Sequence, residues 1–475
     1  MVKVKIEPGN TITTTLLQGG GAISEIEGTI IDPEPEPTDS FRLIQDYGAV
    51  GDGQTDDTDA IQHACDDSAS TGNVVVPGTR ADSSKPVFIV RRRGTCSMAR
   101  RTSRYCIAVK SNTKIDGLKA CEFKLGDGED ALIFTNIDQD GGNSNIHFKG
   151  FELNGHRRTQ SDQPQNTAQE NGGIGMDNVR DSSFVDIHAW NVKVYGGNWL
   201  RAVGCEFTRL LCEHSDADGW NFGLGGFECR SCTFEDIWAV DTAQNYTKAN
   251  GQPLQGNPVK LVVIDSAAIG RLGGKNVTGG VKPQGTTRNL TFDLVDFDGG
   301  PRSTANSGLK CQGDQQTADP SRWVNGIRTK KLRAVNCAAE GLRMSHASDC
   351  VVDDAYLENC GEDASGREQP SMVFREVCRD CGVNKMQIKN GKGVGVELRK
   401  PDVQNVWTKE LYVDGVTGNA IRNGSNGTYT VDYAEMRNVQ RHHASASGLV
   451  IIKHLKADKP LSTSGNVRVE RFERF

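Results

Sequence analysis

Acidic, imidazole and indole side chains are concentrated between residues 154 and 241 of this 475-residue chain. Hydrolysis of a glycosidic bond needs two carboxyl groups, one to protonate the leaving oxygen and one to activate water or attack the anomeric carbon. The candidates for such carboxyl groups are Asp218, Asp216, Glu213, Glu235 and Asp241. The candidates for binding sugar are His156, Arg157, His188, Trp190, His214, Trp220 and Trp238. These residue types could serve such chemistry, and Asp218 is the leading catalytic candidate.

Each candidate also has a structural interpretation. Asp218 precedes Gly219, and an Asp-Gly pair before a strand is common turn chemistry. Exposed acids are abundant, and a tryptophan near a sugar-binding surface fills a core as often as it stacks on a sugar. The polar segment 154–172, NGHRRTQSDQPQNTAQENG, is long enough to wall a groove.

Charge and hydropathy exclude several classes of function. The formal net charge of -6 and pI near 5.9 provide no global basic field for a phosphate backbone, so we expect no nucleic acid partner and a ligand of little or no charge. No apolar run approaches the roughly 20 residues that span a bilayer, so we expect no membrane insertion. The first ten residues, MVKVKIEPGN, lack the apolar core of a signal peptide, and we expect no export by the general secretory route.

The 14 cysteines predict reduced, buried thiols, because a long chain without a signal peptide has little use for a disulfide framework. Cys205 and Cys229, Cys337 and Cys360, and Cys212 and Cys232 are spaced as equivalent positions in successive repeats would be. The two CxxC pairs, CRSC at 229–232 and CRDC at 378–381, could each supply half of a zinc site. They are far apart in sequence and no histidine flanks them at ligand spacing, so we expect no metal and no cofactor.

From residue 173 the chain settles into a loose repeat of short apolar or alternating runs separated by Gly, Asn and Asp turns. Repeats that begin at Gly173, Gly197 and Gly219, and at Val394 and Ala420, are spaced by about 22–26 residues. Such a period predicts a solenoid in which each coil buries its apolar side chains by stacking on its neighbours. The LxxLxL pattern of leucine-rich repeats is missing. We therefore expect an all-β fold, a right-handed parallel β-helix.

One segment, 55–70, has a helical pattern. Thr55 or Asp56 could cap it, Asp57 and Asp59 would favour its N-terminus, and apolar residues recur at helical spacing from residue 60 to 65. The stretch DYGAVGDGQTDDTDAIQHA (46–64), with NVVVPGT (73–79) and VFIV after it, closely resembles the segment that begins the β-helix of the pectate-lyase-like superfamily. That superfamily includes phage tailspikes, polygalacturonase-like hydrolases, glucanases and alginate epimerases. The resemblance implies a helix that caps the N-terminal end of the solenoid.

The resemblance implies structural rather than catalytic roles for Asp52, Asp56 and Asp57, and it specifies no reaction. DADGW (216–220) resembles the Asn-Thr-Asp-Gly segment of polygalacturonases, which would place a catalytic acid at Asp218. The paired aspartates, the Gly-His-Gly and the Arg-Ile-Lys of those enzymes are absent. The Asp-Pro-His-Glu signature of alginate epimerases and an arginine motif of the pectate lyase kind are absent as well.

These observations predict three regions: an N-terminal attachment segment and linker (1–40), the β-helix (41–440) and a C-terminal strand segment (441–475) that could serve oligomerisation. In character the chain is most similar to bacteriophage tailspikes, which implies a homotrimer on the virion tail that binds and depolymerises a bacterial surface polysaccharide outside the cell. Two alternatives stay open. One is a free extracellular polysaccharide-active hydrolase, lyase or epimerase, and the other is a receptor-binding spike without catalysis.

Overall fold

The computed structural model describes residues 12–18, 21–28, 40–98, 101–160, 172–224, 226–242, 256–300, 307–314, 319–361, 368–400 and 402–475. The chain forms two compact units, Met1–Phe41 and Arg42–Phe475. The first unit contains an antiparallel strand pair, β1 (Ile12–Gln18) and β2 (Gly21–Gly28). The linker predicted around the PEPEP sequence lies outside the described residues, and the attachment role of residues 1–40 stays a prediction.

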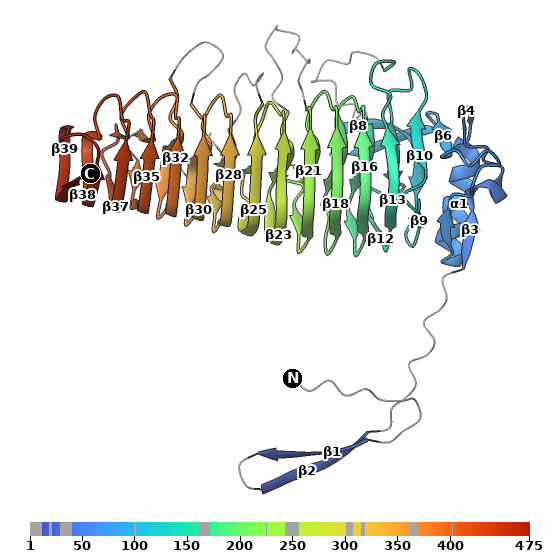
Figure 1. Cartoon of the computed structure of the whole chain (residues 1–475). Helices are drawn as coiled ribbons and strands as arrows, with labels where there is room; N and C mark the ends of the chain where they lie inside the picture. Colours follow the sequence, from blue (N-terminus) through green and yellow to red (C-terminus); the bar gives the residue numbers. More distant parts are fainter. Residues whose placement is uncertain are drawn as a thin grey trace. The chain divides into compact units, whose positions relative to one another are not determined.

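The second unit is a parallel β-helix whose strands stack coil upon coil (Figure 1). One face, here called face A, consists of β13 (His147–Asn154), β16 (Ser183–Trp190), β18 (Glu206–Glu213), β21 (Thr233–Val240), β23 (Ile264–Lys275), β25 (Arg288–Asp298), β28 (Arg328–Val335), β30 (Val351–Glu358), β32 (Gly382–Lys389), β35 (Val406–Asp414) and β37 (Thr428–Arg437). The predicted all-β parallel β-helix is confirmed.

A second face, here called face B, lies after the turn that ends each face A strand. Its strands are β8 (Arg101–Val109), β11 (Leu132–Asn136), β14 (Gly172–Asp177), β17 (Tyr195–Leu200), β19 (Trp220–Phe222), β22 (Val259–Val262), β24 (Lys282–Gln284), β26 (Leu309–Gln312), β29 (Leu342–Ser348), β31 (Met372–Arg379), β33 (Val396–Arg399) and β36 (Ile421–Asn423). Short strands at the next corner lead back to face A: β12 (Asn143–Ser144), β15 (Val179–Arg180), β20 (Cys229–Arg230), β27 (Val324–Asn325) and β34 (Val403–Gln404).

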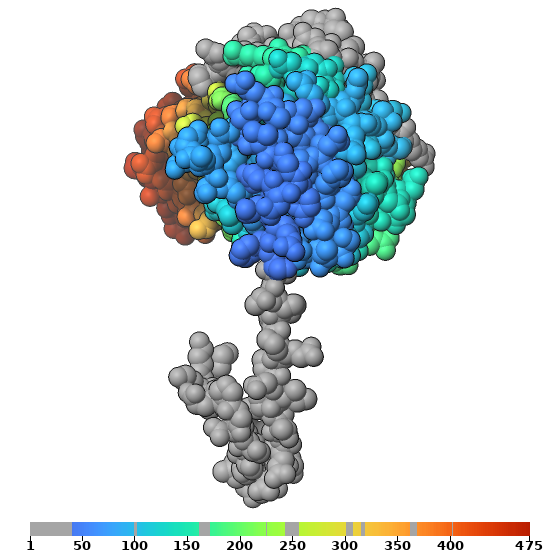
Figure 2. Space-filling model, turned by 90° about the vertical axis from the view of Figure 1, so that its right-hand side faces the viewer, coloured from blue at the N-terminus to red at the C-terminus, as the bar shows by residue number. Residues whose placement is uncertain are grey.

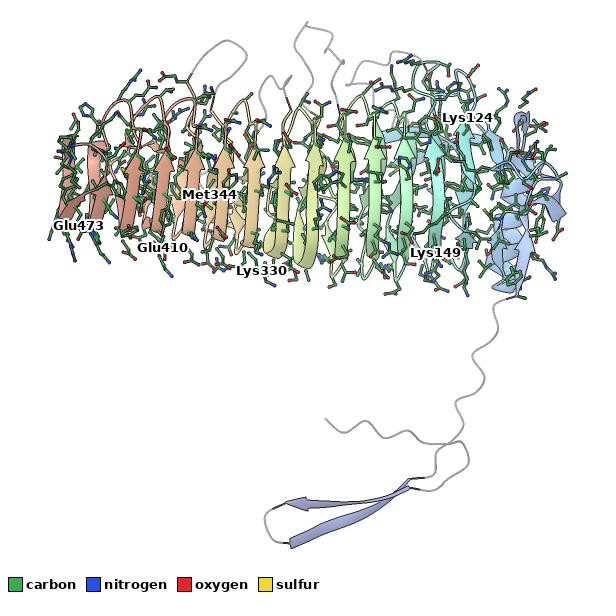
Figure 3. The ribbon with its side chains drawn as sticks, viewed as in Figure 1. Lys124, Lys149, Lys330, Met344, Glu410 and Glu473 are labelled. Carbon is green, nitrogen blue, oxygen red and sulfur yellow. The ribbon has the colours of Figure 1, made fainter. Side chains whose placement is uncertain are left out.

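Side-chain alternation along these strands creates the core. Successive residues of a strand point to opposite sides, so every second apolar residue enters the interior and stacks on its equivalent in the next coil. Phe184, Phe207 and Phe234 form such a stack, with ring centroids 5.4 and 5.2 Å apart. Charged side chains take the outer positions, and those of Lys149 and Lys330 project along the lower edge of the coils in Figure 3.

The turn after each face A strand explains the Asn and Asp content of the repeats. Except after β13 and β25, its first residue has a positive φ, which asparagine and aspartate tolerate better than most residues. The asparagines at this position are Asn191, Asn276, Asn336, Asn359, Asn390 and Asn438. Their side chains also link neighbouring coils, as where the Asn359 amide donates to Asn336 Oδ1 at 3.2 Å.

The predicted capping helix is α1 (Thr58–Thr71), and it covers the N-terminal end of the solenoid, blue in the end-on view of Figure 2. Ile61, Ala64 and Cys65 are buried against the first coils, and the Gln62 amide bonds both backbone groups of Ala108 at 2.8 and 2.9 Å. The helix begins at Thr58 and ends at Thr71, close to the bounds of the segment 55–70 that has the helical pattern. Covering this end protects apolar side chains and unpaired strand groups from water.

Three aspartates before α1 have structural partners, as expected. Asp52 accepts the backbone N–H groups of Gln54 and Thr55 in a turn, at 2.8 and 2.7 Å. Asp57 is the N-cap residue of α1, where Thr55 or Asp56 was expected, and its carboxylate binds the backbone N–H groups of residues 50 and 51. Asp56 accepts hydrogen bonds from Thr58. Burial raises the pKa of Asp57, whereas the backbone N–H groups lower the pKa of Asp52.

The C-terminal end differs from the expected boundary near residue 440. β38 (Ala444–Ala457) pairs in parallel with β37 and β36, and β39 (Thr463–Arg474) pairs in parallel with β38. Residues 441–475 therefore form the last coils of the same solenoid. Their alternating apolar residues, such as Ile452 and Leu455, continue the core of the preceding coils. Of the described residues, no helix is long and apolar enough to cross a membrane.

All 14 cysteines are free thiols, and only Cys96 is not buried. The expected equivalence of Cys337 and Cys360 is confirmed by the register of β28 and β30. The predicted equivalences of Cys205 with Cys229 and of Cys212 with Cys232 were wrong. Cys205 stacks on Cys232, and Cys212 lies opposite Ala239, because successive coils differ in length. Burial raises the pKa of core thiols such as those of Cys212 and Cys229, which favours their neutral form.

Candidate functional site

Trp220, predicted to bind sugar, belongs to the core. It is fully buried, stacks near Trp199 with ring centroids 5.9 Å apart, and donates its indole N–H to the Trp238 carbonyl at 2.9 Å. Its position on β19 points inward because the strand alternation assigns Asn221, not Trp220, to the outer surface of face B. A sugar cannot reach this ring without opening the core.

The candidates His188, Glu213, Trp190, Trp238 and Glu235 lie on the outer surface of face A. His188 Nε2 is 2.8 Å from Glu213 Oε2 on the next coil, so these two candidates form a pair. Trp190 and Trp238 are half-buried, and the guanidinium of Arg271 lies 4.3 Å from the centre of the Trp238 ring. Glu235 is exposed.

A shallow pocket adjoins the His188 side chain on face A. Its charged lining residues largely neutralise one another: Asp186 receives two hydrogen bonds from Arg209, at 2.6 and 2.9 Å, and lies 3.1 Å from Lys119. The Arg209 guanidinium, then Lys119, lowers the pKa of Asp186 to about 2. Paired charges of this kind leave few groups free for a ligand.

Two further candidates occupy the left-handed turn position described above. His214 and Asp241 follow β18 and β21 directly and have φ values of 57° and 54°. Asp241 accepts a hydrogen bond from the Asn276 amide of the next coil, and its other oxygen lies 3.4 Å from His214 Nδ1. Their contacts are those of a turn ladder, which sequence spacing alone does not distinguish from a catalytic pair.

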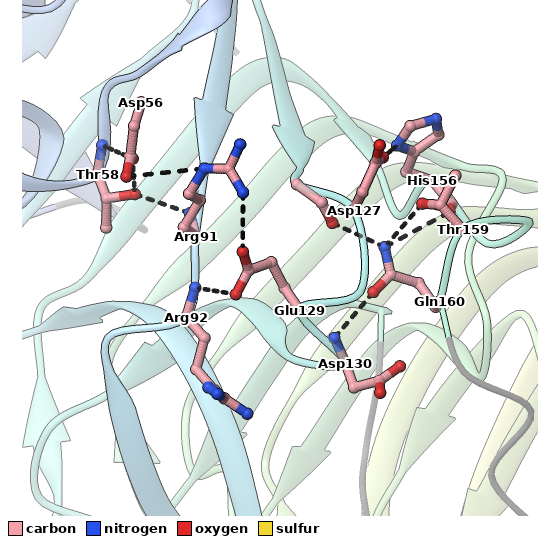
Figure 4. Close-up of polar contacts among 11 residues, drawn as sticks. Asp56, Thr58, Arg91, Arg92, Asp127, Glu129, Asp130, His156, Thr159 and Gln160 are labelled. Carbon is pink, nitrogen blue, oxygen red and sulfur yellow. Dashed lines mark hydrogen bonds and ion pairs between the residues drawn. The ribbon is translucent and has the colours of Figure 1, made fainter.

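His156 and Gln160, at the start of the connection between β13 and β14, bind residues 126–130. His156 Nδ1 lies 2.9 Å from Asp127 Oδ1, and the Gln160 amide bonds the carbonyl of Gly126 and the N–H of Asp130 (Figure 4). The rest of the expected groove wall, residues 161–171, lies outside the described residues. Nothing in these contacts brings His156 to the other candidates.

Asp216 and Asp218 lie in the turn that leads into β19 of face B, and Arg157 binds Asp216. Arg157 donates to Asp216 Oδ1 at 2.9 Å, and Lys193 lies 3.6 Å from Asp216 Oδ2. Asp218 Oδ1 accepts the backbone N–H and the side-chain amide of Asn257 at 2.6 and 2.8 Å. Asp218 is 7% exposed, and its other oxygen receives no hydrogen bond from a described residue. Among the five predicted carboxylates, these two adjoin face B.

The outer surface of face B carries functional candidates that sequence reasoning missed. Lys260, Lys282, Lys310 and Arg343 occupy one register position on four consecutive coils, here called the cationic ladder. Their strand neighbours on both sides belong to the core, so the four side chains point outward. Lys282 and Lys310 are half-buried and Arg343 is buried. Asn221 and Asn198 continue the same register toward the N-terminus.

A second row of polar side chains runs beside the cationic ladder, two residues further along each strand. It contains Gln284, Gln312 and Ser345. The side-chain oxygens of Gln284 and Gln312 are buried without a hydrogen-bond partner, as is Nε of Arg343 in the ladder. A buried polar atom without a partner costs about 1–3 kcal/mol, and such atoms on an outer strand surface indicate a place where a ligand can bind.

The electrostatics of the ladder are unfavourable in the unbound protein. Burial, followed by the charge of Lys260, lowers the pKa of Lys282 to about 8, and burial followed by Arg343 lowers the pKa of Lys310 to about 7. Burial also lowers the pKa of Arg343. Asp218 partly offsets the effect at Lys282, and Glu340 does so at Lys310. The ladder is therefore a strip of cationic groups whose charged forms are disfavoured by burial and by one another, with only partial compensation from acids.

A sequence signal for the ladder exists, but it is weak. The strands VKLV, LKCQ and LRMS each begin with an apolar residue followed by a cation, and KPQ begins with its cation directly after Val281. Each run alone is an ordinary half-buried strand. Their alignment on one surface depends on the lengths of the intervening turns, which vary. Within the described ranges, no three His, Cys, Asp or Glu side chains gather as a metal site would require.

Comparison with known proteins agrees with the fold. The family model described as "Rhamnogalacturonase A/epimerase, pectate lyase-like" matches residues 41–79. No curated protein is significantly similar to the chain in sequence.

Three solved structures illustrate the similarity of the whole fold. A tailspike protein mutant of E. coli bacteriophage HK620, in complex with a pentasaccharide, is 10% identical with a TM-score of 0.57, over 97% of this chain and 82% of that one. The N-terminal fragment of bacteriophage Phi29 gene product 12 is 13% identical with a TM-score of 0.54, over 89% and 79%. PfbA, a surface adhesin of Streptococcus pneumoniae, is 12% identical with a TM-score of 0.53, over 86% and 92%. The expected resemblance to the pectate-lyase-like parallel β-helix proteins is therefore confirmed.

Proposed function

We propose that this chain is a tailspike-like protein that binds a bacterial surface polysaccharide along the outer surface of face B and depolymerises it. The observation that carries the proposal is the pair of polar rows on consecutive coils, with buried amide oxygens that lack partners. An extended glycan parallel to the solenoid axis could contact one such group about every 4.8 Å, the spacing of neighbouring strands. The pentasaccharide complex of the similar phage tailspike supports this proposal.

Asp218 is the catalytic carboxylate that we propose for this surface. Asn257 holds one of its oxygens, which fixes the orientation of the carboxylate, and the other oxygen accepts no hydrogen bond from a described residue. Asp216 is neutralised by Arg157 and Lys193, which suits a residue that positions the turn. The proposed arrangement differs from the one expected from sequence, because Glu213 and Glu235 lie on face A.

A second candidate function is binding without cleavage. Glycoside hydrolysis by two carboxyl groups requires a partner for Asp218, and the described contacts place only Asp216 beside it in the same turn. The similarity to a surface adhesin fits a spike that recognises its receptor and leaves it intact. Both candidates use face B, so they differ only in the fate of the glycan.

A homotrimer on a virion tail remains part of the proposal. β39 pairs with β38 on one side, and no described strand pairs with its other edge. An open strand edge is a ready surface for association with another chain. The segment 441–475 would thus serve assembly as the last coils of the solenoid, and the protein would act outside the bacterial cell.

The test of cleavage uses a panel of purified bacterial capsules and lipopolysaccharides. Reducing ends and the absorbance of unsaturated sugars are followed together, so that hydrolysis and elimination are both detected. We expect Asp218→Asn to bind the cleaved polysaccharide but to lower the rate by orders of magnitude, and Glu235→Gln on face A to retain full activity. Near wild-type activity of Asp218→Asn would exclude it as a catalytic residue, and binding without any cleavage would favour the receptor-binding function.

The test of the binding surface uses a bulky neutral side chain. Gln284→Trp places a large ring on the outer surface of face B, and Gln387→Trp places the same ring on face A. We expect Gln284→Trp to lose polysaccharide binding and Gln387→Trp to retain it. Thermal unfolding of both variants serves as the control that each is folded. Loss of binding in Gln387→Trp alone would move the site to face A.

A further inference from the structure

The positive charges of the cationic ladder are not neutralised by direct ion pairs within the described residues. No described residue forms an ion pair with Lys260, Lys282, Lys310 or Arg343. Elsewhere on face B the charged outer positions are paired: Glu397 bonds both Arg399 and Arg422. The described Asp218 and Glu340 are engaged with Asn257 and Ser307 instead.

Three segments that adjoin the ladder strands in the sequence contain no acidic residue. Residues 243–255 connect into β22, residues 301–306 precede β26, and residues 315–318 follow β26; none contains an aspartate or a glutamate. In this strip of four cations about 4.8 Å apart, the acids whose charges act on Lys282 and Lys310 are Asp218 and Glu340, which are fewer than the cations. Like charges this close repel one another and are costly when they are partly removed from water.

We propose that the cationic ladder binds an acidic polysaccharide, with its negative groups on successive coils and its hydroxyl groups on the adjacent row of Gln284, Gln312 and Ser345. This inference rests on the proposed function and adds the class of glycan. It reverses the expectation, drawn from the net charge of -6, of a ligand with little charge. Net charge describes the whole surface, whereas recognition depends on the local field.

The chemistry of the two rows favours a glycan over a single-stranded nucleic acid, the other common linear polyanion. Proteins that bind single strands combine cations with aromatic rings on which bases stack. The outer positions beside the ladder carry amides and hydroxyls, which match sugar hydroxyl groups. The described outer positions of β22, β24, β26 and β29 hold no aromatic side chain.

Protonation of the ladder provides an internal check. The charged groups that face Lys282 and Lys310 are Lys260, Asp218, Arg343, Glu340 and Arg375. With pKa values lowered to about 7 and about 8, Lys310 and Lys282 lose their charge as pH rises through that range. Binding of an acidic glycan should therefore weaken between pH 6 and pH 9, and binding of a neutral glycan should not.

The experiment compares each acidic polysaccharide of the panel with its own neutral form. Uronate carboxyl groups are reduced to alcohols, sulfate groups are removed chemically, and neutral polysaccharides and single-stranded DNA complete the set. Binding is measured for the full chain, for Lys310→Met and for Lys331→Met, the matched control on face A, where Lys331 is exposed and has no ion pair. Lysine and methionine are similar in length, so the change removes charge with little loss of packing.

We expect the full chain to bind acidic polysaccharides of the panel and to lose this binding when their charged groups are removed. Lys310→Met should weaken it by about tenfold or more and lower the slope of log affinity against log salt by about one, while Lys331→Met should change neither. Loss on carboxyl reduction or on desulfation identifies the anion. Binding of a neutral polysaccharide that Gln284→Trp abolishes and Lys310→Met preserves would overturn this inference and leave the proposed function standing. Preference for DNA, or no polysaccharide bound at all, would overturn both.

Discussion

Replacing Lys310 by methionine should stabilise the protein. The pKa of Lys310 falls from 10.5 to about 7, mainly because the side chain is buried and then because of Arg343. At about 1.4 kcal/mol per pKa unit, the charged form is disfavoured in the folded state by up to about 5 kcal/mol. Lys310 keeps part of its surface in water, so we expect a gain of about 2–4 kcal/mol in the free energy of unfolding.

The sign of the pH dependence follows from the lowered pKa. Below pH 7 the folded protein carries the full cost of the charged amine, and this cost disappears as pH rises from about 7 to 10.5. The stability difference between Lys310→Met and the parent should therefore be largest at or below pH 7 and should shrink toward pH 10. Methionine fills the space of the lysine stem, which limits the cavity contribution.

Thermal unfolding by calorimetry or circular dichroism measures this effect. For a unit of about 430 residues the unfolding entropy is about 0.9 kcal/mol per kelvin, so the expected gain corresponds to an increase of about 2–4 °C in Tm at pH 7. Lys331→Met serves as the control and should leave Tm unchanged within a degree. A lower Tm for Lys310→Met, or a difference that does not vary with pH, would refute the reasoning.

Three further predictions concern the core, the thiols and assembly. Trp220→Ala should lower the free energy of unfolding by about 3–5 kcal/mol, since the ring is fully buried; a near-neutral change in Tm would contradict its assignment to the core. Under native conditions iodoacetamide should label Cys96 first, and the other thiols should react only after unfolding; rapid native labelling of Cys229 would argue against the burial described here. Light scattering at micromolar concentration should give three times the 51.5 kDa of one chain, and a monomer would exclude assembly through residues 441–475.

The fold was predictable because its signals are local and repeated. The segment 46–64 carries its turn residues and its amphipathic helix in consecutive positions, and each coil repeats the same alternation and Asn turn. Even so, the coil equivalences of Cys205 and Cys212 were wrong, because a spacing of 20–24 residues does not determine how many turn residues each coil contains. At the C-terminal end, β38 and β39 pair in parallel with the preceding coil, so residues 441–475 continue the solenoid, which the sequence alone did not indicate.

The site was harder to predict, because the candidate residues between positions 154 and 241 lie on different faces of the solenoid. Glu213 and Asp216 are three residues apart, yet a turn separates them, so that one faces outward on face A and the other adjoins face B. Trp220 was predicted to bind sugar but lies in the core. A shift of one residue in register reverses which side chains of a strand face inward, and the sequence does not fix that register.

The amino-acid sequence by itself determined the β-helix, its capping helix and the turn chemistry, because each depends on residues that are neighbours in the chain. Only the tertiary structure decided the position of the cationic ladder. Lys260, Lys282, Lys310 and Arg343 are separated by 22, 28 and 33 residues, and they become neighbours because parallel strands of successive coils stack in register. Recognition on such a surface is formed across coils, and its spacing is set by the hydrogen bonds between strands rather than by distance along the chain.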